Sequence, residues 1–342
     1  MRQGLGNHGM GSVSVAAGPV SVSLTVRRNE TGSYRTSLDQ TWLRPEEGER
    51  ARVIAGLVVT KLSAKTAFAL GISQSGRTLQ QRLAGQYGRA FLVARDPLTA
   101  TGFQADPGTS VGFRHQVGRF GLTATSERGR QWRWRPDQRT ERPSYSMNAA
   151  TIDTRVGPAT FNLGATQLHE SRTMLGSSFG PSLSIGRSRT MFVDGSADVA
   201  FGSGWAASAS YRRGWTKVSG TGQLVEGGSL GTQAFSADLS KARLFVDDDR
   251  LAFRFAQPLR VVKGGFEMDL PVSYDYVSGK TGYGNRFMSL SPKGRELDYE
   301  LSYGRPMFGG YLDLNGFVRT DPGNVEAMRN DVGGAIRFHL RY

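Results

Sequence analysis

Hydrophobic and polar residues alternate along the last nine residues of the chain, from Gly334 to Tyr342. This period of two is the signature of a β-strand. In water, such a terminal strand with one wholly apolar face invites aggregation. In a membrane barrel the same face meets lipid, and the last Tyr lies in the interfacial aromatic girdle. We therefore expect a terminal barrel strand whose apolar face acts as the membrane-insertion signal; that face consists of Ile336, Phe338, Leu340 and Tyr342.

The same alternation recurs upstream in at least six segments. Their apolar faces are Leu297, Tyr299, Leu301 and Tyr303; Phe266, Met268, Leu270, Val272 and Tyr274; Leu251, Phe253 and Phe255; Met191, Val193, Ala197, Val199 and Phe201; Phe161, Leu163 and Ala165; and Phe120, Leu122 and Ala124. A soluble sandwich also alternates. However, the polar faces carry Asp and Glu on some strands and Arg on others, which suits charge pairing across a closed lumen. The pattern favours an all-β fold, a closed antiparallel transmembrane β-barrel with an even number of strands, between about 12 and 16.

Connection lengths give an independent indication. Short connections are expected near Gly118 and at 157–158, 202–204, 247–249 and 305–309, whereas long polar stretches cover 127–146, 169–189 and 214–231. Transmembrane barrels alternate short periplasmic turns with long extracellular loops. If the C-terminus lies on the periplasmic side, this alternation of short and long connections requires one more strand near 286–290, before a turn at 291–294.

The first hundred residues are less regular. Strands are predicted at 20–26, 34–42, 53–62 and 66–73, a short helix at 78–83 and a loop at 96–108. We divide the chain into an N-terminal segment, 1–18, and an outer-membrane barrel, 19–342. Residues 19–105 either join the barrel wall or lie partly outside it.

Composition narrows the class of protein. Hydrophobic residues make up 38% of the 342 residues, and no window approaches the run of about 18–20 apolar residues that a membrane helix needs, which excludes a helical inner-membrane protein. Cysteine is absent, so disulfides and cysteine-bound zinc are excluded, as suits a chain that crosses the periplasm. The first residues have no apolar signal-peptide core. We therefore expect a mature form or a part of a longer protein.

The charge is strongly basic, +14, and comes from 36 Arg and only 7 Lys. Six of these Arg interleave with two Trp in segment 127–142. Guanidinium groups bind phosphates and stack on indoles. We interpret the segment first as a solvated loop and second as a lipopolysaccharide contact, with nucleic acid least favoured because no nucleic-acid motif is present. The residues of the expected contact are Arg128, Arg130, Trp132, Arg133, Trp134 and Arg135.

Candidate catalytic groups are few. The four His are His8, His115, His169 and His339. We expect His339 to face the lumen and His115 to be interfacial, and His169-Glu170 to be an exposed dipeptide at the start of a long loop. Gly108-Thr109-Ser110 resembles the nucleophile segment of subtilisin-like proteases but continues without its Met-Ala and Pro. The glycine pairs at 227–228 and 264–265 lack the features of phosphate loops. We expect no catalytic, cofactor-binding or metal-binding residues, and no enzyme.

The C-terminal third carries a family resemblance. Its motifs are Asp249-Arg250-Leu251, Gln257-Pro258-Leu259-Arg260-Val261, Ser291-Pro292-Lys293-Gly294-Arg295-Glu296-Leu297-Asp298, Asp321-Pro322-Gly323-Asn324 and Phe338-His339-Leu340-Arg341-Tyr342. They are similar to the C-terminal barrel region of subtilisin-family autotransporter peptidases of alphaproteobacteria, in which a protease passenger precedes the barrel. None of the protease motifs is present here.

The resemblance implies the translocator part of such a protein, or a stand-alone relative. The expected function is an outer-membrane anchor and secretion conduit; the alternative is a porin-like channel or outer-membrane transporter. Further alternatives are a barrel enzyme and a soluble β-rich module. The expected partners are outer-membrane lipid and lipopolysaccharide, the barrel-insertion machinery and a covalently linked passenger domain upstream, with no nucleic acid.

Overall fold

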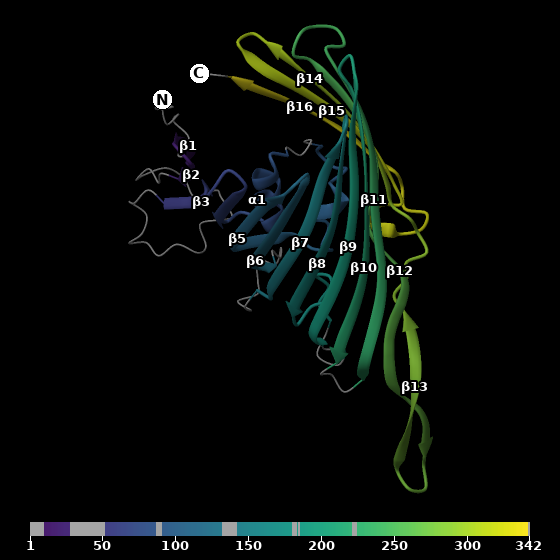
Figure 1. Cartoon of the computed structure of the whole chain (residues 1–342). Coiled ribbons are helices and arrows are strands. Elements are labelled where there is room, and N and C mark those ends of the chain that lie inside the picture. The colour runs from purple at the N-terminus through teal and green to yellow at the C-terminus, as the bar shows by residue number, and fades with distance from the viewer. Residues whose placement is uncertain are drawn as a thin grey trace, which may run out of the picture.

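The computed structural model of the chain describes residues 10–27, 52–86, 91–131, 142–179, 183, 185–220 and 224–340. These residues form one antiparallel sheet of 16 strands, which curves around a short helix (Figure 1). The strands are β1 (Met10–Ala17), β2 (Val20–Arg27), β3 (Arg52–Lys61), β4 (Thr66–Ile72), β5 (Ala105–Val117), β6 (Phe120–Gln131), β7 (Ser144–Val156), β8 (Ala159–Ser171), β9 (Ile185–Gly202), β10 (Trp205–Gly220), β11 (Val225–Ala242), β12 (Arg250–Asp275), β13 (Lys280–Ser289), β14 (Leu297–Met307), β15 (Gly310–Thr320) and β16 (Asp331–Leu340). The helix is α1 (Gly76–Ala84), and two 3-10 turns are η3 (Pro97–Thr99) and η5 (Pro322–Asn324).

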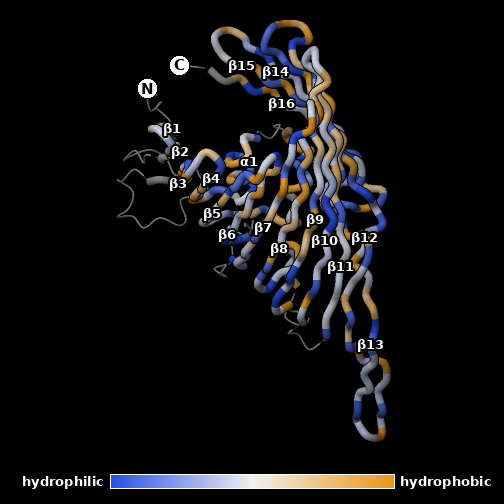
Figure 2. The backbone as a smooth tube through the Cα atoms, in the orientation of Figure 1, coloured by the Kyte–Doolittle hydropathy of each residue, from blue (hydrophilic) through white to orange (hydrophobic). Residues whose placement is uncertain are grey.

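The alternation read from the sequence is present in the strands, and Figure 2 shows it as changing colour along the backbone. In β9, Met191, Val193 and Phe201 are exposed while Phe192 is fully buried. In β16, Ile336 is 78% and Phe338 44% exposed. The Leu340 side chain and Tyr342 lie outside the described residues, as do 34–42. Four predictions for the first hundred residues are confirmed: strands near 20–26, 53–62 and 66–73, and a helix near 78–83.

The connections separate into two ends of the sheet. One end, the short-turn end, has brief turns such as 18–19, 118–119, 157–158, 203–204 and 308–309. The opposite end, the long-connection end, has longer ones such as 172–184 and 321–330. The expectation of a long polar stretch at 214–231 is wrong, because β10 and β11 run through it and leave only 221–224 between them. The predicted loop 96–108 is also shorter, since β5 starts at Ala105.

The expected extra strand exists as β13, but the parity argument for it is wrong. β12 is 26 residues long and pairs antiparallel with β14 through Arg250–Ala256 and with β13 through Gly265–Asp275. Strands β13 and β14 therefore run in the same direction, and 291–294 does not reverse the chain. At the change of partner the backbones approach so closely that a Cβ on Gly265 would overlap the Met288 carbonyl. The β12–β13 hairpin projects beyond the other strands (Figure 1).

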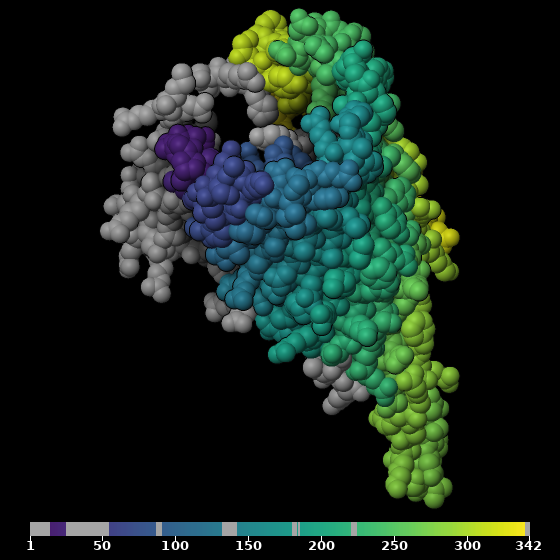
Figure 3. Space-filling view, viewed as in Figure 1, coloured from purple at the N-terminus to yellow at the C-terminus, as the bar shows by residue number. Residues whose placement is uncertain are grey.

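The sheet is not closed by hydrogen bonds among the described residues. β1 and β16 lie at the two ends of the strand order and do not pair with each other. All steps along that order are antiparallel, and both strands run from the long-connection end towards the short-turn end. In Figure 3 the described N-terminal residues (purple) lie on the left of the molecule, and the C-terminal residues (yellow) lie at the top and along the right side. β1 falls within the segment 1–18 that the sequence set apart, and it pairs with β2 in the common sheet.

The described residues of the connection from β4 to β5, 73–86 and 91–104, fold back onto the concave face of the sheet. We call them the inner segment. Its helix α1 begins at Gly76 and is capped by the preceding residue, Ser75, whose hydroxyl accepts a hydrogen bond from the Thr78 N–H. Leu79 of this helix is fully buried and packs against Leu57 and Ala69. Gly112 of β5 lacks a side chain where a Cβ would meet Leu83 and Leu79, so the helix can lie close to the strands.

No described helix is long and apolar enough to cross a membrane.

Candidate functional site

The concave face binds the inner segment through the backbone of residues 92–94. The carboxylate of Glu300, on β14, accepts hydrogen bonds from the N–H groups of Leu92 (2.6 Å), Val93 (2.8 Å) and Ala94 (2.9 Å). Asn315 on β15 donates to the same carboxylate at 2.8 Å. Glu300 is only 1% exposed. Consecutive backbone N–H groups form a recess that favours an anion, so one buried charge holds three residues of the segment.

Two buried arginines bind carbonyl groups of the same segment. Arg254 of β12 donates to the Ala94 carbonyl at 3.0 Å and forms a bidentate pair with Asp238 of β11. Arg212 of β10 donates to the Ala100 carbonyl at 2.7 Å and forms a bidentate pair with Asp194 of β9. A buried charge is costly unless it is paired, so each aspartate stabilises its buried arginine in the position from which the arginine binds the inner segment.

A fourth anchor lies at the helix. The buried Glu127 carboxylate of β6 accepts from the Gly76 N–H at 2.7 Å and from the hydroxyl of Tyr145. Near the other end of α1, Gln86 donates to Asn162 of β8 at 3.0 Å. The inner segment is thus bound to strands from β6 to β14, across most of the concavity.

At the long-connection end, the concave face is filled by an apolar cluster. Its buried members are Tyr145, Leu168, Met174, Leu175, Ile185, Phe192, Val218, Val225, Leu230, Phe266 and Met268. Residues 172–179, which follow β8, enter this cluster, and the buried Glu170 holds them by accepting from the N–H groups of Leu175 and Gly176 at 2.8 and 2.9 Å. The side chains at this end therefore exclude water from part of the concavity.

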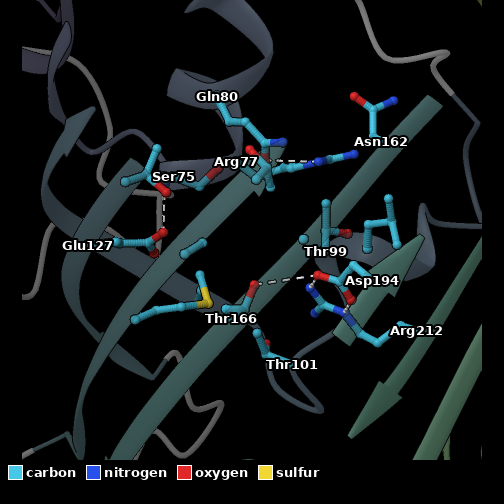
Figure 4. Close-up of a pocket in the computed structure, with 18 of the residues that line it drawn as sticks. Ser75, Arg77, Gln80, Thr99, Thr101, Glu127, Asn162, Thr166, Asp194 and Arg212 are labelled. Atoms are coloured by element: carbon cyan, nitrogen blue, oxygen red, sulfur yellow. Dashed lines mark hydrogen bonds and ion pairs between the residues drawn. The ribbon is translucent and has the colours of Figure 1, made fainter. Parts of the chain in front are cut away.

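A cavity of about 280 Å³ lies between the inner segment and strands β6 to β10 (Figure 4). Arg77 and Gln80 border it from the helix, Thr99 from η3, and Thr166, Asp194 and Arg212 from the sheet. A second cavity, of about 490 Å³, lies on the other side of Leu98 and Thr99 and is lined by Asp238, Arg254 and several serines. The lining of the first cavity is mainly apolar with polar groups at its border, and that of the second is more polar, so each can hold water or a small molecule.

The histidines do not assemble a catalytic group in the described part of the chain. His115 is exposed on the convex face and contacts the Thr66 hydroxyl at 2.9 Å. The expectation of an exposed His169-Glu170 pair is wrong. Adjacent residues of a strand point to opposite faces, so His169 is exposed while Glu170 is buried on the concave side. His8 and the side chain of His339 lie outside the described residues.

The serine and glycine motifs considered in the sequence lie within strands. Ser110 of the Gly108-Thr109-Ser110 segment is 2% exposed in the middle of β5, beneath the helix. The glycine pairs 227–228 and 264–265 lie within β11 and β12, not in loops. Among the described residues, no group of three His, Asp or Glu side chains is placed to hold a metal ion.

The expected lipopolysaccharide contact is only partly described. Arg128 and Arg130 are exposed on the convex face of β6. Trp132, Arg133, Trp134 and Arg135 lie outside the described residues.

At the short-turn end, the carboxylate of Asp249 binds the backbone of the connection between β11 and β12. Asp249 is buried between β11 and β12 and accepts from the N–H groups of Leu244, Phe245 and Val246 and from the Tyr303 hydroxyl. Desolvation raises the pKa of this carboxyl, but these four hydrogen bonds outweigh it and hold the pKa below its ordinary value.

The residues that hold the inner segment were not found from the sequence. Asp and Glu on some polar faces and Arg on others predicted charge pairing in general. Which residues pair depends on strand register, and the backbone N–H groups of 92–94 that Glu300 binds are about 200 residues away in the chain.

Comparisons with protein-family profiles, with curated proteins and with solved structures found no match for this chain.

Proposed function

We propose that this chain is an outer-membrane β-barrel that serves as membrane anchor and translocator of a linked passenger. The observation that carries the proposal is the convex face of the sheet. Large apolar side chains are exposed there on successive strands, including Phe113, Leu122, Leu163, Val193 and Phe253. In water such a face is an aggregation hazard, whereas lipid is its natural solvent.

The height of this apolar face fits a membrane. On β9 the outward-facing row extends from Met191 to Phe201, ten residues further along the strand, and its members are exposed or half-buried. At about 3.3 Å per residue this row is about 33 Å long. A barrel strand tilted by about 40° would then cross about 25 Å, the height of the lipid-facing band in outer-membrane barrels. The concave face, which carries the buried ion pairs and, at the long-connection end, the apolar cluster, becomes the lumen.

Barrel closure is part of the proposal. Because β1 and β16 run in the same direction, direct pairing between them would be parallel. In such a barrel the inner segment occupies the lumen. Passage of a passenger or a solute therefore requires the contacts of Glu300, Arg254 and Arg212 to open.

Membrane insertion tests the proposal. The double variant Phe338→Ser, Tyr342→Ser removes two aromatic residues from the terminal apolar face, and we expect it to fail to insert into the outer membrane. The control variant Phe245→Ser, Phe308→Ser removes two exposed aromatic residues from connections at the short-turn end. Membrane fractionation and heat-modifiable migration on gels report insertion. Normal insertion of the terminal variant, or a chain that stays soluble without detergent, contradicts the proposal.

A porin-like channel is the second candidate, and the second cavity beside the inner segment, with its more polar lining, favours it. Conductance in planar bilayers without any passenger, with preference for anions, would support the channel. Absence of conductance together with surface display of a fused passenger would support the translocator.

A further inference from the structure

A basic surface crosses five strands on the convex face, near the long-connection end. Strand register places two rows of outward side chains side by side. The first row is Arg128, Ser146, His169, Arg189 and Lys217, and the second is Arg130, Ser144, Ser171, Arg187 and Ser219. We call these ten positions the basic belt.

The belt carries positively charged and hydroxyl side chains and no negative charge. Its ten positions hold five permanent cations, one His and four Ser, and no carboxylate. All five cations are exposed, and none forms an ion pair with another described residue. Asp106, the carboxylate beside Arg130, is bound by Arg142 at 2.8 Å. Arginine, lysine and serine are the side chains that bind phosphate oxygens.

On β9 and β10 the belt borders directly on the apolar band, which is the set of exposed apolar residues on the convex face. Towards the short-turn end, the next outward residue is Met191 after Arg189 and Trp215 after Lys217, and both are exposed. On β6, β7 and β8 the same row holds Ser126, Asn148 and Gln167. A ligand that touches both surfaces is amphipathic, with an anionic head and apolar chains. Nucleic acid does not fit, because it has no apolar chain to place on this band.

An apolar groove lies at one end of the belt. It has a volume of about 560 Å³ and is lined by Val58, Leu70, Ile72, Val111 and Leu24, with Arg128 at its border. Register places Gly56 between Leu24 and Ile72 in an outward row, and the missing side chain leaves the hollow. An acyl chain in this groove places its head group next to Arg128.

We propose that the basic belt binds the phosphates of lipopolysaccharide in the outer leaflet, with an acyl chain in the adjacent groove. This inference rests on the proposed membrane location and deepens it. Neighbouring strands are about 4.8 Å apart, so the five strands span about 19 Å. This width and the five cations match a head group with more than one phosphate and several chains, rather than the single phosphate of a phospholipid. The long-connection end then faces the cell exterior.

Binding in detergent tests the belt separately from membrane insertion. The full chain is refolded in detergent micelles, and the dissociation constant of fluorescent rough-form lipopolysaccharide is measured. The belt variant is Arg187→Gln, Arg189→Gln, Lys217→Gln. The control variant, Lys61→Gln, Lys65→Gln, Arg119→Gln, removes the same charge from the short-turn end. All these residues are exposed, so both variants should keep the circular dichroism of the unaltered chain.

We expect the belt variant to bind lipopolysaccharide roughly tenfold more weakly or worse, since three exposed charge contacts, each modest by itself, are lost together. The control should bind normally, and salt should weaken binding of the unaltered chain. Equal affinities of the belt and control variants overturn the proposal. Equal affinity for dephosphorylated lipopolysaccharide, or for phosphatidylglycerol, also overturns it.

The two proposals fail in different ways. The belt variant should still insert into the outer membrane, because the apolar band is intact. A chain that inserts but binds lipopolysaccharide independently of the belt refutes only the belt. A chain that does not insert refutes the proposed function, whatever its affinity for lipopolysaccharide.

Discussion

Replacement of Glu300 by Gln is expected to release the inner segment while the sheet stays folded. The Glu300 carboxylate accepts four hydrogen bonds, two on each oxygen. A Gln side chain keeps the shape but has only one acceptor oxygen. Its NH2 group would face the donors of either Val93 and Ala94 or Leu92 and Asn315.

The magnitude follows from the bonds that are lost. A hydrogen bond to a charged group contributes about 1.5–3 kcal/mol, and a buried donor without a partner costs about 1–3 kcal/mol. Such contributions are not additive, and water can reach part of the segment once it opens. We therefore expect the free energy of opening the segment to fall by about 3 kcal/mol. Amide exchange at 91–101 should then become on the order of a hundredfold faster.

Hydrogen exchange of the refolded chain in micelles, read by mass spectrometry, measures this directly. Peptides from β9 and β10 serve as an internal reference for the sheet, and their exchange should not change. Glu267→Gln is the matched control, because Glu267 is exposed on β12. Unchanged exchange at 91–101 in the Glu300 variant, or faster exchange spread evenly over the sheet, would refute the reasoning.

Two further predictions concern the apolar band and the turn at Asp249. Leu163→Arg, in the middle of the apolar band, should lower the free energy of unfolding in lipid vesicles by about 2–4 kcal/mol. Ser146→Arg, at the basic belt, should lower it by only about 0–1 kcal/mol. Urea unfolding measures both values, and equal values would argue against the membrane position. Because the pKa of Asp249 is lower in the folded chain, its stabilising contribution is present above the ordinary Asp pKa of about 3.9 and is lost as the pH falls through the folded value. The difference in unfolding free energy between the unaltered chain and Asp249→Asn should therefore shrink below about pH 4, and a difference that stays constant down to acid pH would contradict this assignment.

Local features of the fold followed from the sequence. A period of two along β8, β9, β14 and β16 is set by the geometry of the strand itself, in which successive side chains point to opposite faces. Turns such as 118–119 and 157–158 were found because glycine is suited to their left-handed backbone, with φ of 58° at both Gly118 and Gly157. No knowledge of neighbouring strands was needed for either.

Features that depend on register and on distant partners were decided by the tertiary structure. β13 was expected for the wrong reason, because the sequence does not show that β12 is long enough to pair with two strands. Glu170 was expected to be exposed, yet it is buried against connection 172–184. Arg128, Arg189 and Lys217 are far apart in the chain and come together only through the pairing of β6 to β10. A side chain's face is set by its own strand, but its neighbours are set by how the strands align, and for that reason the anchors of the inner segment and the basic belt could be found only in the folded chain.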